Sequence, residues 1–323
     1  MRTVTRLPLF LVVSFLSGIA CAQQEGDKVV VSADKAPLRS LEDTTGTVSK
    51  GAILFVKNVD GDWFWVIWSN GYETVKGWIN RSNVIPYSQA LDFFNRELKR
   101  NPTASVYNNR GMIWNEKGEH AIAIGDFNEA IRLNPNVKQF YNNRGVAWDE
   151  MTEYDKAIAD FDQAIRLDPR YASAFNNRGN VWVAKDEYGK AVSDYNEAIR
   201  LNPKDASAFY NRAHVWSDKE EHDKAISDYT QAIRLDAKDA SAYKNRGNAW
   251  KAKGEYDKAL SDYDKAIRID PKFAIAYLNR GNVWWAKQEY RKASSDYNEA
   301  IRLGIRSLGT EGGRSMTLRK RVN

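Results

Sequence analysis

Hydrophobic and polar positions follow two different periods along the chain, and the change of period divides it into two parts. Over residues 27–87, short runs of β-branched and aromatic residues alternate with turn signals. Over residues 104–303, apolar side chains recur at intervals of three and four, which places them on one face of a helix. The pattern predicts a small β barrel followed by a long helical region.

The barrel is predicted from three apolar runs and the turns between them. Asp60-Gly61-Asp62 separates the second and third runs, and an Asp-Gly pair in this position is a strong hairpin signal. Along the third run, Trp63 and Trp65 share one face of the strand, whereas Phe64 and Val66 share the other. Both faces are apolar, so we expect one of them to leave the core. The three runs are Val29–Val31, Ala52–Val56 and Trp63–Trp68.

The helical region is built from a repeated unit of constant length. Tyr-Asn-Asn-Arg-Gly at 107–111 returns at 141–145, and related pentapeptides begin at 175, 209, 243 and 277. In each unit the ring, the Gly (Ala213 in the fourth unit) and the Trp lie at i, i+4 and i+7, and an Ala-ring-Ala set repeats this spacing further on. Each unit therefore predicts two antiparallel helices that interlock small against large side chains. The six units are 104–137, 138–171, 172–205, 206–239, 240–273 and 274–303.

Helix-breaking residues mark the ends of the predicted helices. Gly118 and Gly254 fall in the turn between the two helices of a unit, and a Pro follows the second helix in four units. Ahead of the first unit, Ala90, Phe94 and Pro102 reproduce the spacing of a second helix, with a connector that is one residue shorter. Residues 88–103 are therefore predicted as a half repeat that caps the array.

The repeat resembles the tetratricopeptide repeat (TPR), whose pattern is Trp-x-x-Leu-Gly-x-x-Tyr followed by Ala, Phe, Ala and Pro. The resemblance spans residues 104–303 and implies an α-α solenoid. The fold class is therefore α+β multidomain: a small barrel, then six full repeats with an N-terminal half repeat. One departure is systematic, because the Leu of the pattern is Arg in all six units, and an Asp follows sixteen residues later. We expect each Arg to pair with its own Asp, since an unpaired guanidinium between helices is costly.

The β region, residues 27–87, resembles the bacterial SH3-like (SH3b) domain. Ala36-Pro37-Leu38-Arg39, Gly61-Asp62-Trp63-Phe64-Trp65-Val66 and Gly77-Trp78-Ile79 carry the resemblance. The family implies envelope or extracellular proteins that bind cell-wall peptides or protein segments. Its aromatic face would consist of Trp63, Trp65, Trp68 and Trp78. This face either binds an extended peptide or packs against the rest of the chain.

Residues 1–22 have the layout of a secretory signal peptide. Arg2 and Arg6 precede a short apolar run, and Ala20-Cys21-Ala22 supplies small residues for cleavage after Ala22. The run is too short for a spanning helix. Two other interpretations are an uncleaved anchor and lipidation at Cys21, where the sequence resembles a bacterial lipobox. We expect a secreted or periplasmic protein.

Composition and charge exclude several function classes. One Cys and three His rule out a Cys/His zinc cluster, a disulfide framework and a multi-His metal site. The formal charge of +6 lies at the ends of the chain, +2 in residues 1–22 and +4 in residues 304–323. The neutral body between them does not favour nucleic acid. Residues 304–323 are predicted to be a disordered basic tail.

The predicted function is that of an exported, non-enzymatic scaffold that binds a protein or peptide in the concave groove of the repeats. No phosphate loop, nucleophile motif or partnered carboxylates outside the repeat pattern support catalysis, and no cofactor is expected. The alternative is an envelope protein whose SH3-like domain binds cell-wall material, and self-association through the C-terminal repeat is left open. An Asn directly before the Arg recurs in all six units and suits either a peptide backbone or bonds between helices. The predicted groove residues are Asn109, Asn142, Asn143, Asn176, Asn177, Asn180, Tyr210, Asn211, His214, Lys244, Asn245, Asn248, Asn279 and Trp285.

Overall fold

The computed structural model describes residues 27–33, 35–39, 44–49, 52–69 and 74–305. The predicted signal segment, Cys21 and nearly all of the predicted tail lie outside these residues. The chain divides into two compact units, of which the first comprises residues 1–67 with 76–87 and the second residues 68–75 with 88–323. No helix in the described part of the chain has the length and apolar character needed to cross a membrane.

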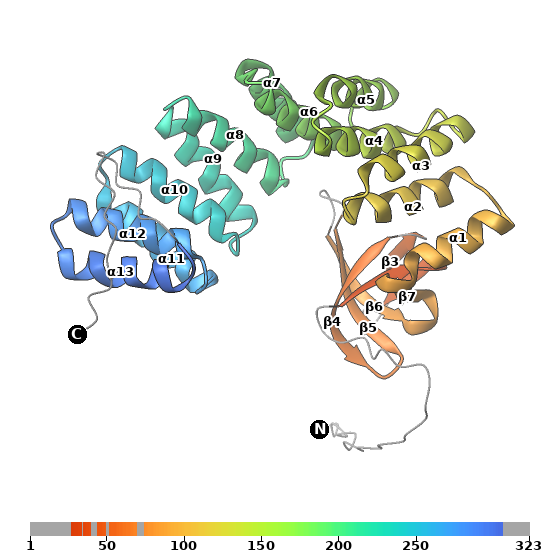
Figure 1. Ribbon diagram of the computed structural model, residues 1–323, viewed down its shortest axis with the longest axis horizontal. Helices are drawn as coiled ribbons and strands as arrows, with labels where there is room; N and C mark the ends of the chain where they lie inside the picture. The colour runs from red at the N-terminus through yellow and green to blue at the C-terminus, as the bar shows by residue number, and fades with distance from the viewer. Residues whose placement is uncertain (1–26, 34, 40–43, 50–51, 70–73, 306–323) are drawn as a thin grey trace, which may run out of the picture. The chain divides into compact units, whose positions relative to one another are not determined.

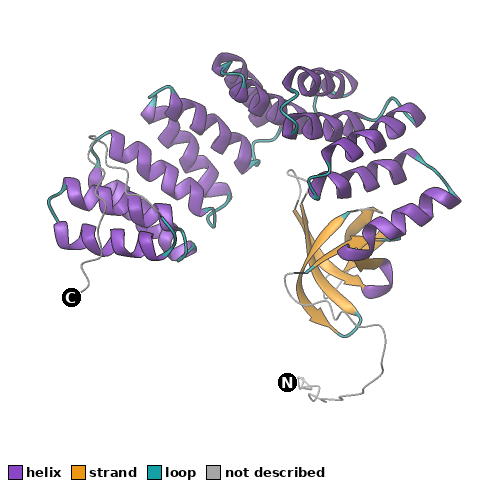
Figure 2. Cartoon of the chain, viewed as in Figure 1, coloured by secondary structure: helices purple, strands orange, loops and turns teal. Residues whose placement is uncertain are grey.

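The first unit contains an antiparallel sheet of seven strands in the order β3-β2-β6-β5-β4-β1-β7, which curves into a small half-barrel (Figure 2). The predicted hairpin is confirmed, because β4 and β5 pair with Asp60 opposite Trp63, and Gly61 has a φ of +54° in the turn. Short 3₁₀ turns at Arg81–Asn83 and Tyr87–Gln89 flank the last strand. The strands are β1 Lys28–Val31, β2 Lys35–Arg39, β3 Thr44–Ser49, β4 Ile53–Asp60, β5 Trp63–Ser69, β6 Thr74–Asn80 and β7 Val84–Pro86.

Strand alternation decides which face of β5 forms the core. Phe64 and Val66 are fully buried, whereas Trp63 and Trp65 are half-buried on the opposite face. Leu54 and Ile79 complete this side of the core. One of the two apolar faces of the third run therefore leaves the core, as the sequence predicted.

The second unit is a stack of helix pairs, as predicted (Figure 1). Every repeat supplies a first helix and a second helix of similar length, joined by a short turn. The helices are α1 Ala90–Arg100, α2 Ala104–Glu116, α3 His120–Leu133, α4 Lys138–Glu150, α5 Tyr154–Leu167, α6 Ala172–Ala184, α7 Tyr188–Leu201, α8 Ala206–Asp218, α9 His222–Leu235, α10 Ala240–Ala252, α11 Tyr256–Ile269, α12 Ala274–Ala286 and α13 Tyr290–Arg302.

The two helices of a repeat approach closely where a Gly faces an aromatic ring. A Cβ added to Gly179 would lie 2.7 Å from Cε1 of Tyr195, closer than real Cβ contacts. The same relation holds for Gly111, Gly145, Gly247 and Gly281. Gly is therefore required by the close approach of α6 to α7 and by its counterparts, and the fourth repeat, with Ala213, is the exception.

The predicted Arg–Asp pairs are confirmed in all six repeats. Arg178 donates from Nε and Nη2 to the two carboxylate oxygens of Asp194, at 2.8 and 2.6 Å. The Asp side chain is 8% exposed and the Arg side chain 20%. This bidentate geometry joins the first helix of the repeat to the second. The other pairs are Arg110–Asp126, Arg144–Asp160, Arg212–Asp228, Arg246–Asp262 and Arg280–Asp296.

Each of these Arg residues also bonds the preceding second helix, a contact that the repeat pattern did not predict. Nη1 of Arg178 donates to Asp162 on α5, so one guanidinium holds three helices together. Arg110 makes the equivalent bond to Asn95 on α1, so α1 offers α2 the contact that a full repeat would offer. The remaining partners are Asn128, Asn196, Thr230 and Asp264.

A left-handed residue closes the turn between the two helices of each repeat. Gly118 and Gly254 have φ values of +82° and +75°, as expected for Gly in a turn. The equivalent residues in the other repeats carry side chains, and Thr152 and Gln288 have φ values of +59° and +63°. A β-branched residue in this region carries backbone strain.

Candidate functional site

The first helices of neighbouring repeats contact one another directly: α4 contacts α2 and α6, and α8 contacts α6 and α10. We refer to the exposed and half-buried side chains of α2, α4, α6, α8, α10 and α12 as the first-helix surface. Most of the predicted groove residues belong to it, and two of them, Asn142 and Asn176, are buried beneath it.

The recurring Asn residues bond across neighbouring repeats. Nδ2 of Asn143 donates to Oδ1 of Asn108 at 2.9 Å, and Asn177 donates to Asn142 at 3.1 Å. Asn211 continues the series to Asn176 at 3.2 Å. In the last two repeats the acceptors change, because Asn245 donates to the Tyr210 hydroxyl and Asn279 donates to Asn248. In the first repeat Asn109 instead accepts a hydrogen bond from Asn108. Of the two roles considered for these Asn residues, the structure shows the bonds between helices, and peptide binding stays a prediction.

A second set of bonds links the ring of the second helix to the first-helix surface. The Tyr195 hydroxyl donates to Oδ1 of Asn180 at 2.8 Å, and Tyr263 does the same to Asn248. Tyr297 and Asn282 form the third such pair. A pattern in the sequence accompanies these bonds. Where the ring is Phe127 or Phe161, the residue fifteen positions earlier is apolar, Met112 or Val146, and where the ring is Tyr it is polar.

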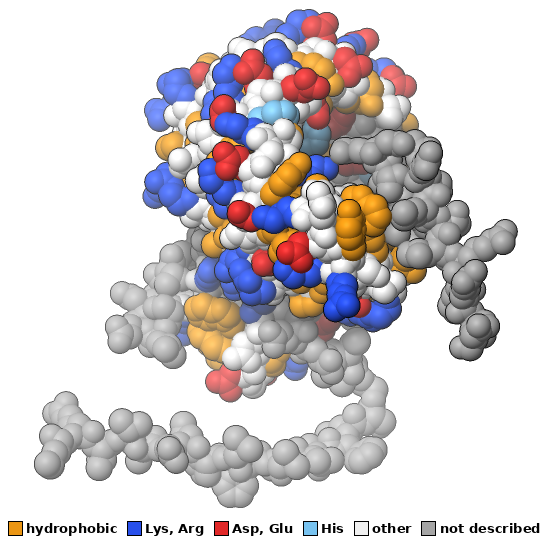
Figure 3. Space-filling model, turned by 90° about the vertical axis from the view of Figure 1, so that its left-hand side faces the viewer, with side chains coloured by type: hydrophobic (Ala, Val, Ile, Leu, Met, Phe, Trp, Pro, Cys, Tyr) orange, Lys and Arg blue, Asp and Glu red, His pale blue; other side chains and the backbone are white. Residues whose placement is uncertain are grey.

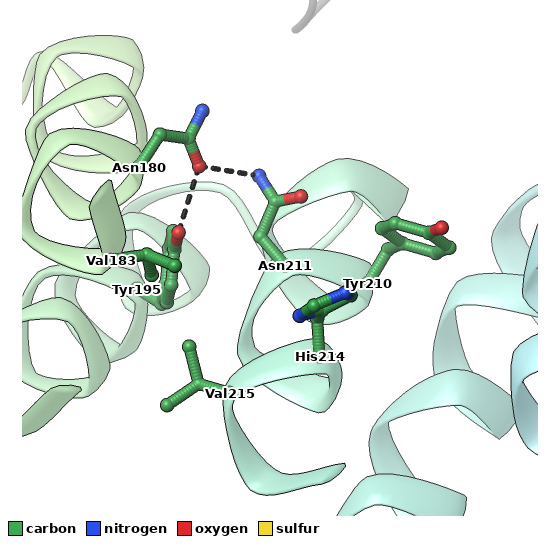
Figure 4. Close-up of a pocket in the computed structure, with 7 residues that line it drawn as sticks. All are labelled: Asn180, Val183, Tyr195, Tyr210, Asn211, His214 and Val215. Atoms are coloured by element: carbon green, nitrogen blue, oxygen red, sulfur yellow. Dashed lines mark hydrogen bonds between the residues drawn. The ribbon is translucent and has the colours of Figure 1, made fainter. Parts of the chain in front are cut away.

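A pocket of about 140 Å³ lies between the third and fourth repeats (Figure 4). Four predicted groove residues meet there, namely Asn180 from α6 and Tyr210, Asn211 and His214 from α8. Oδ1 of Asn180 accepts two hydrogen bonds, from Tyr195 and from Nδ2 of Asn211 at 3.0 Å. The structure adds three lining residues that were absent from the predicted site: Val183, Tyr195 and Val215.

Burial sets the electrostatics of this region. It raises the pKa of Tyr195 and of Tyr210, so both phenols stay protonated and can donate at neutral pH. Burial also lowers the pKa of the Lys244 ammonium, although Asp239 partly opposes this shift. His214 lies at the rim of the pocket, with Nδ1 at 3.1 Å from Oδ2 of Asp218.

Trp285 and the predicted aromatic face of the β region are not among the residues that line the pocket. Trp285 on α12 is 46% exposed and stacks edge-on against Tyr290 at 4.9 Å. In the β region, Trp65 and Trp78 form an edge contact at 5.4 Å, and the Arg39 guanidinium lies over the Trp63 ring at 5.2 Å. Trp68 lies on β5, but its side chain is outside the described residues.

Metal-binding side chains do not cluster among the described residues, and the face drawn in Figure 3 carries charges of both signs. No group of three His, Cys, Asp or Glu side chains that could hold a metal ion occurs among them. On the face drawn in Figure 3, Lys and Arg side chains are interspersed with Asp and Glu, and hydrophobic side chains form separate patches. This face therefore lacks the single-sign patch with which proteins hold a phosphate backbone.

Comparison with known proteins identifies the repeats. A family model described as "TPR repeat" matches residues 152–186, 179–216, 217–254 and 247–288, and a "Tetratricopeptide repeat" model matches residues 104–137. Together these matches cover more than half of the chain. A comparison with curated proteins found no match.

Solved structures that superpose with TM-scores above 0.5 share the fold. PilF of Pseudomonas aeruginosa superposes with a TM-score of 0.56 at 19% identity, over 69% of this chain and 95% of that one. A tetratricopeptide repeat protein from Parabacteroides merdae gives 0.53 at 20% identity, over 68% and 88%. YrrB, "a TPR protein with an unusual peptide-binding site", is 28% identical over 55% of this chain and 92% of that one, with a TM-score of 0.48.

Proposed function

Since the chain belongs to the tetratricopeptide repeat proteins, we propose that it is a non-catalytic scaffold that binds a protein partner through its first-helix surface. One observation carries the proposal. The positions that pack the repeats are nearly uniform, whereas the first-helix surface changes chemistry from repeat to repeat, with Tyr210, Lys244 and Leu278 at one equivalent position. Packing does not require this variation, but recognition of a specific partner does.

The partner segment is proposed to bind in an extended conformation. The first-helix surface presents carboxamide groups from several repeats, among them Asn180, Asn248 and Asn282. Carboxamides both donate and accept hydrogen bonds, which suits the alternating N–H and C=O groups of an extended backbone.

The site of action is proposed to be the bacterial envelope or beyond it. The layout of residues 1–22 and the resemblance of the β region to SH3-like domains support this proposal. The exposed Phe55 and the half-buried Trp63, Trp65 and Trp78 give the β region an aromatic surface of its own. We propose that this surface binds a protein segment.

Site-specific photocrosslinking in the cells that encode the protein tests the scaffold function. A photoreactive amino acid replaces Lys251 on the first helix of the fifth repeat, and a matched control replaces the exposed Ser261 on its second helix. We expect a discrete protein adduct from position 251 and none from position 261. Equal crosslinking from both positions, or none from either, would contradict the proposal.

A further inference from the structure

The fourth repeat departs from the common pattern at neighbouring positions. Tyr210 stands where the first three repeats have Asn, Ala213 where the other five have Gly, and His214 where the third, fifth and sixth have Asn. Two of these residues, Tyr210 and His214, line the pocket between the third and fourth repeats. The break in the repeat thus coincides with a cavity.

The walls of this pocket are suited to an apolar group. Val183, Val215 and the rings of Tyr195 and Tyr210 surround it, and the polar atoms of Asn211 and His214 lie beside them (Figure 4). Ligand pockets typically combine apolar walls with a few fixed polar groups. An apolar cavity of about 150 Å³ admits benzene, so a pocket of about 140 Å³ has room for a Leu, Ile or Phe side chain.

The neighbouring bonds fix the orientation of the Asn180 carboxamide. Its Oδ1 accepts from both Tyr195 and Asn211, and this assigns oxygen and nitrogen to the two ends of the group. The residue is exposed, and its Nδ2 has no acceptor among the described residues. Figure 4 shows Nδ2 directed away from Asn211 and Tyr195. A donor is therefore held in place beside the pocket.

A half-buried cation lies on the next helix. Lys244 directly precedes Asn245, whose side chain donates to the Tyr210 hydroxyl at 2.8 Å. The Lys244 side chain forms no ion pair within the described chain, and burial lowers the pKa of its ammonium group. A carboxylate of a bound partner beside this ammonium group would favour its charged form and so offset the effect of burial. Asp218, four residues after His214 on α8, has its Oδ2 3.1 Å from Nδ1 of that His.

We propose that this pocket is the anchor for an extended acidic peptide segment of the partner. One aliphatic or aromatic side chain of the segment fills the pocket, Nδ2 of Asn180 donates to a backbone carbonyl beside it, and Lys244 pairs with a nearby Asp or Glu. The inference rests on the proposed scaffold function and specifies the chemistry of what is bound.

The test selects peptides from a random twelve-residue library displayed on phage, with the full chain as bait. We expect enrichment of a large apolar residue close to Asp or Glu. The best peptide, fluorescently labelled, is then titrated with three variants. Val183→Phe fills the pocket and should weaken binding at least tenfold. Asn180→Ala should weaken it several-fold, and Lys244→Met should remove the preference for the acidic peptide over its Asn or Gln analogue.

Ile122→Ala provides the control, because Ile122 is exposed on α3, a second helix, and lies outside both the pocket and the first-helix surface. It should bind like the unaltered chain, and circular dichroism and thermal melting should show each variant folded. The proposed anchor would be wrong if the library yielded no binding peptide, or if the selected peptides lacked a large apolar residue close to Asp or Glu. It would also be wrong if Val183→Phe bound the best peptide as tightly as the unaltered chain does. If crosslinking from position 251 persists in that case, the scaffold function stands and only the anchor is wrong.

Discussion

The six Arg–Asp pairs form a natural series in which the second partner of the Arg, on the preceding second helix, differs. Arg178 contacts Asp162 of the preceding repeat, whereas Arg246 contacts the hydroxyl of Thr230 at 3.0 Å. Removing the paired Asp therefore leaves Arg178 beside a carboxylate and leaves Arg246 beside a neutral group. We predict that Asp262→Ala is more destabilising than Asp194→Ala.

The magnitude follows from the contacts that are lost. Asp262 accepts two charge-assisted hydrogen bonds, at 2.8 and 2.7 Å, and is 8% exposed. Breaking a buried pair by removing one partner costs about 3–5 kcal/mol, and the 18% exposure of Arg246 places the cost near the lower end, about 3 kcal/mol. Asp162 is 48% exposed, and such a pair is worth about 0.5–1 kcal/mol. The cost of Asp194→Ala is therefore about 2 kcal/mol.

Hydrogen exchange measured by mass spectrometry suits this comparison, because solenoid repeats open locally. The opening free energy is read for α10–α11 in Asp262→Ala and for α6–α7 in Asp194→Ala. A double-mutant cycle with Arg246→Leu, the residue of the common TPR pattern, isolates the pair, and we expect a coupling energy of about 1 kcal/mol or more. Equal losses at the two sites, or a coupling energy of zero, would refute the reasoning.

Three further predictions follow from the helix contacts and turns. Gly179→Ala forces a Cβ against the Tyr195 ring and should lower the stability of its repeat by about 1–3 kcal/mol. Gly125→Ala places its Cβ where no atom lies within 4 Å, so it should raise the stability of its repeat by about 0.5–1 kcal/mol. Opening free energies of α6–α7 and α2–α3, measured by hydrogen exchange, check the two changes. Thr152→Gly removes left-handed strain and should stabilise its repeat by about 1 kcal/mol, and a lower melting temperature would contradict this. Lys244→Met should stabilise the chain below the depressed pKa of Lys244. Between the folded and unfolded pKa values of Lys244, the unfolded state binds one proton more than the folded state, so the stability of the unaltered chain rises with pH. The advantage of Lys244→Met should therefore fade over this range. Denaturant titrations at several pH values measure it, and an advantage that grows with pH would contradict the prediction.

Much of the fold was predictable because the period of the repeat is imposed by packing. Tyr195 needs a Gly opposite it on the neighbouring helix, so both positions recur and reveal the helix pair. The constant separation of sixteen positions between Arg and Asp also predicted a contact. The same separation connects Arg178 backwards to Asp162, and it shortens to fifteen between Asn95 and Arg110, where the connector is shorter. The spacing alone did not predict this second contact, because the contact depends on how neighbouring repeats stack.

The candidate site was less predictable, because it depends on how side chains settle between repeats. Sequence position places Asn180, Tyr210 and His214 on first helices, but the period does not show that they surround a cavity. The cavity arises where α6 meets α8 and where the ring of Tyr210 replaces an Asn. The bonds that orient Asn180 come from a hydroxyl on one helix and an amide on another.

Hydrogen exchange on the complex with the partner captured by crosslinking tests the central claim most directly. The account predicts that the partner slows amide exchange in α6, α8 and α10, with the largest effect around residues 210–214, while α7, α9 and α11 exchange as in the free chain. Protection confined to the second helices, with the first helices unchanged, would contradict the assignment of the binding surface.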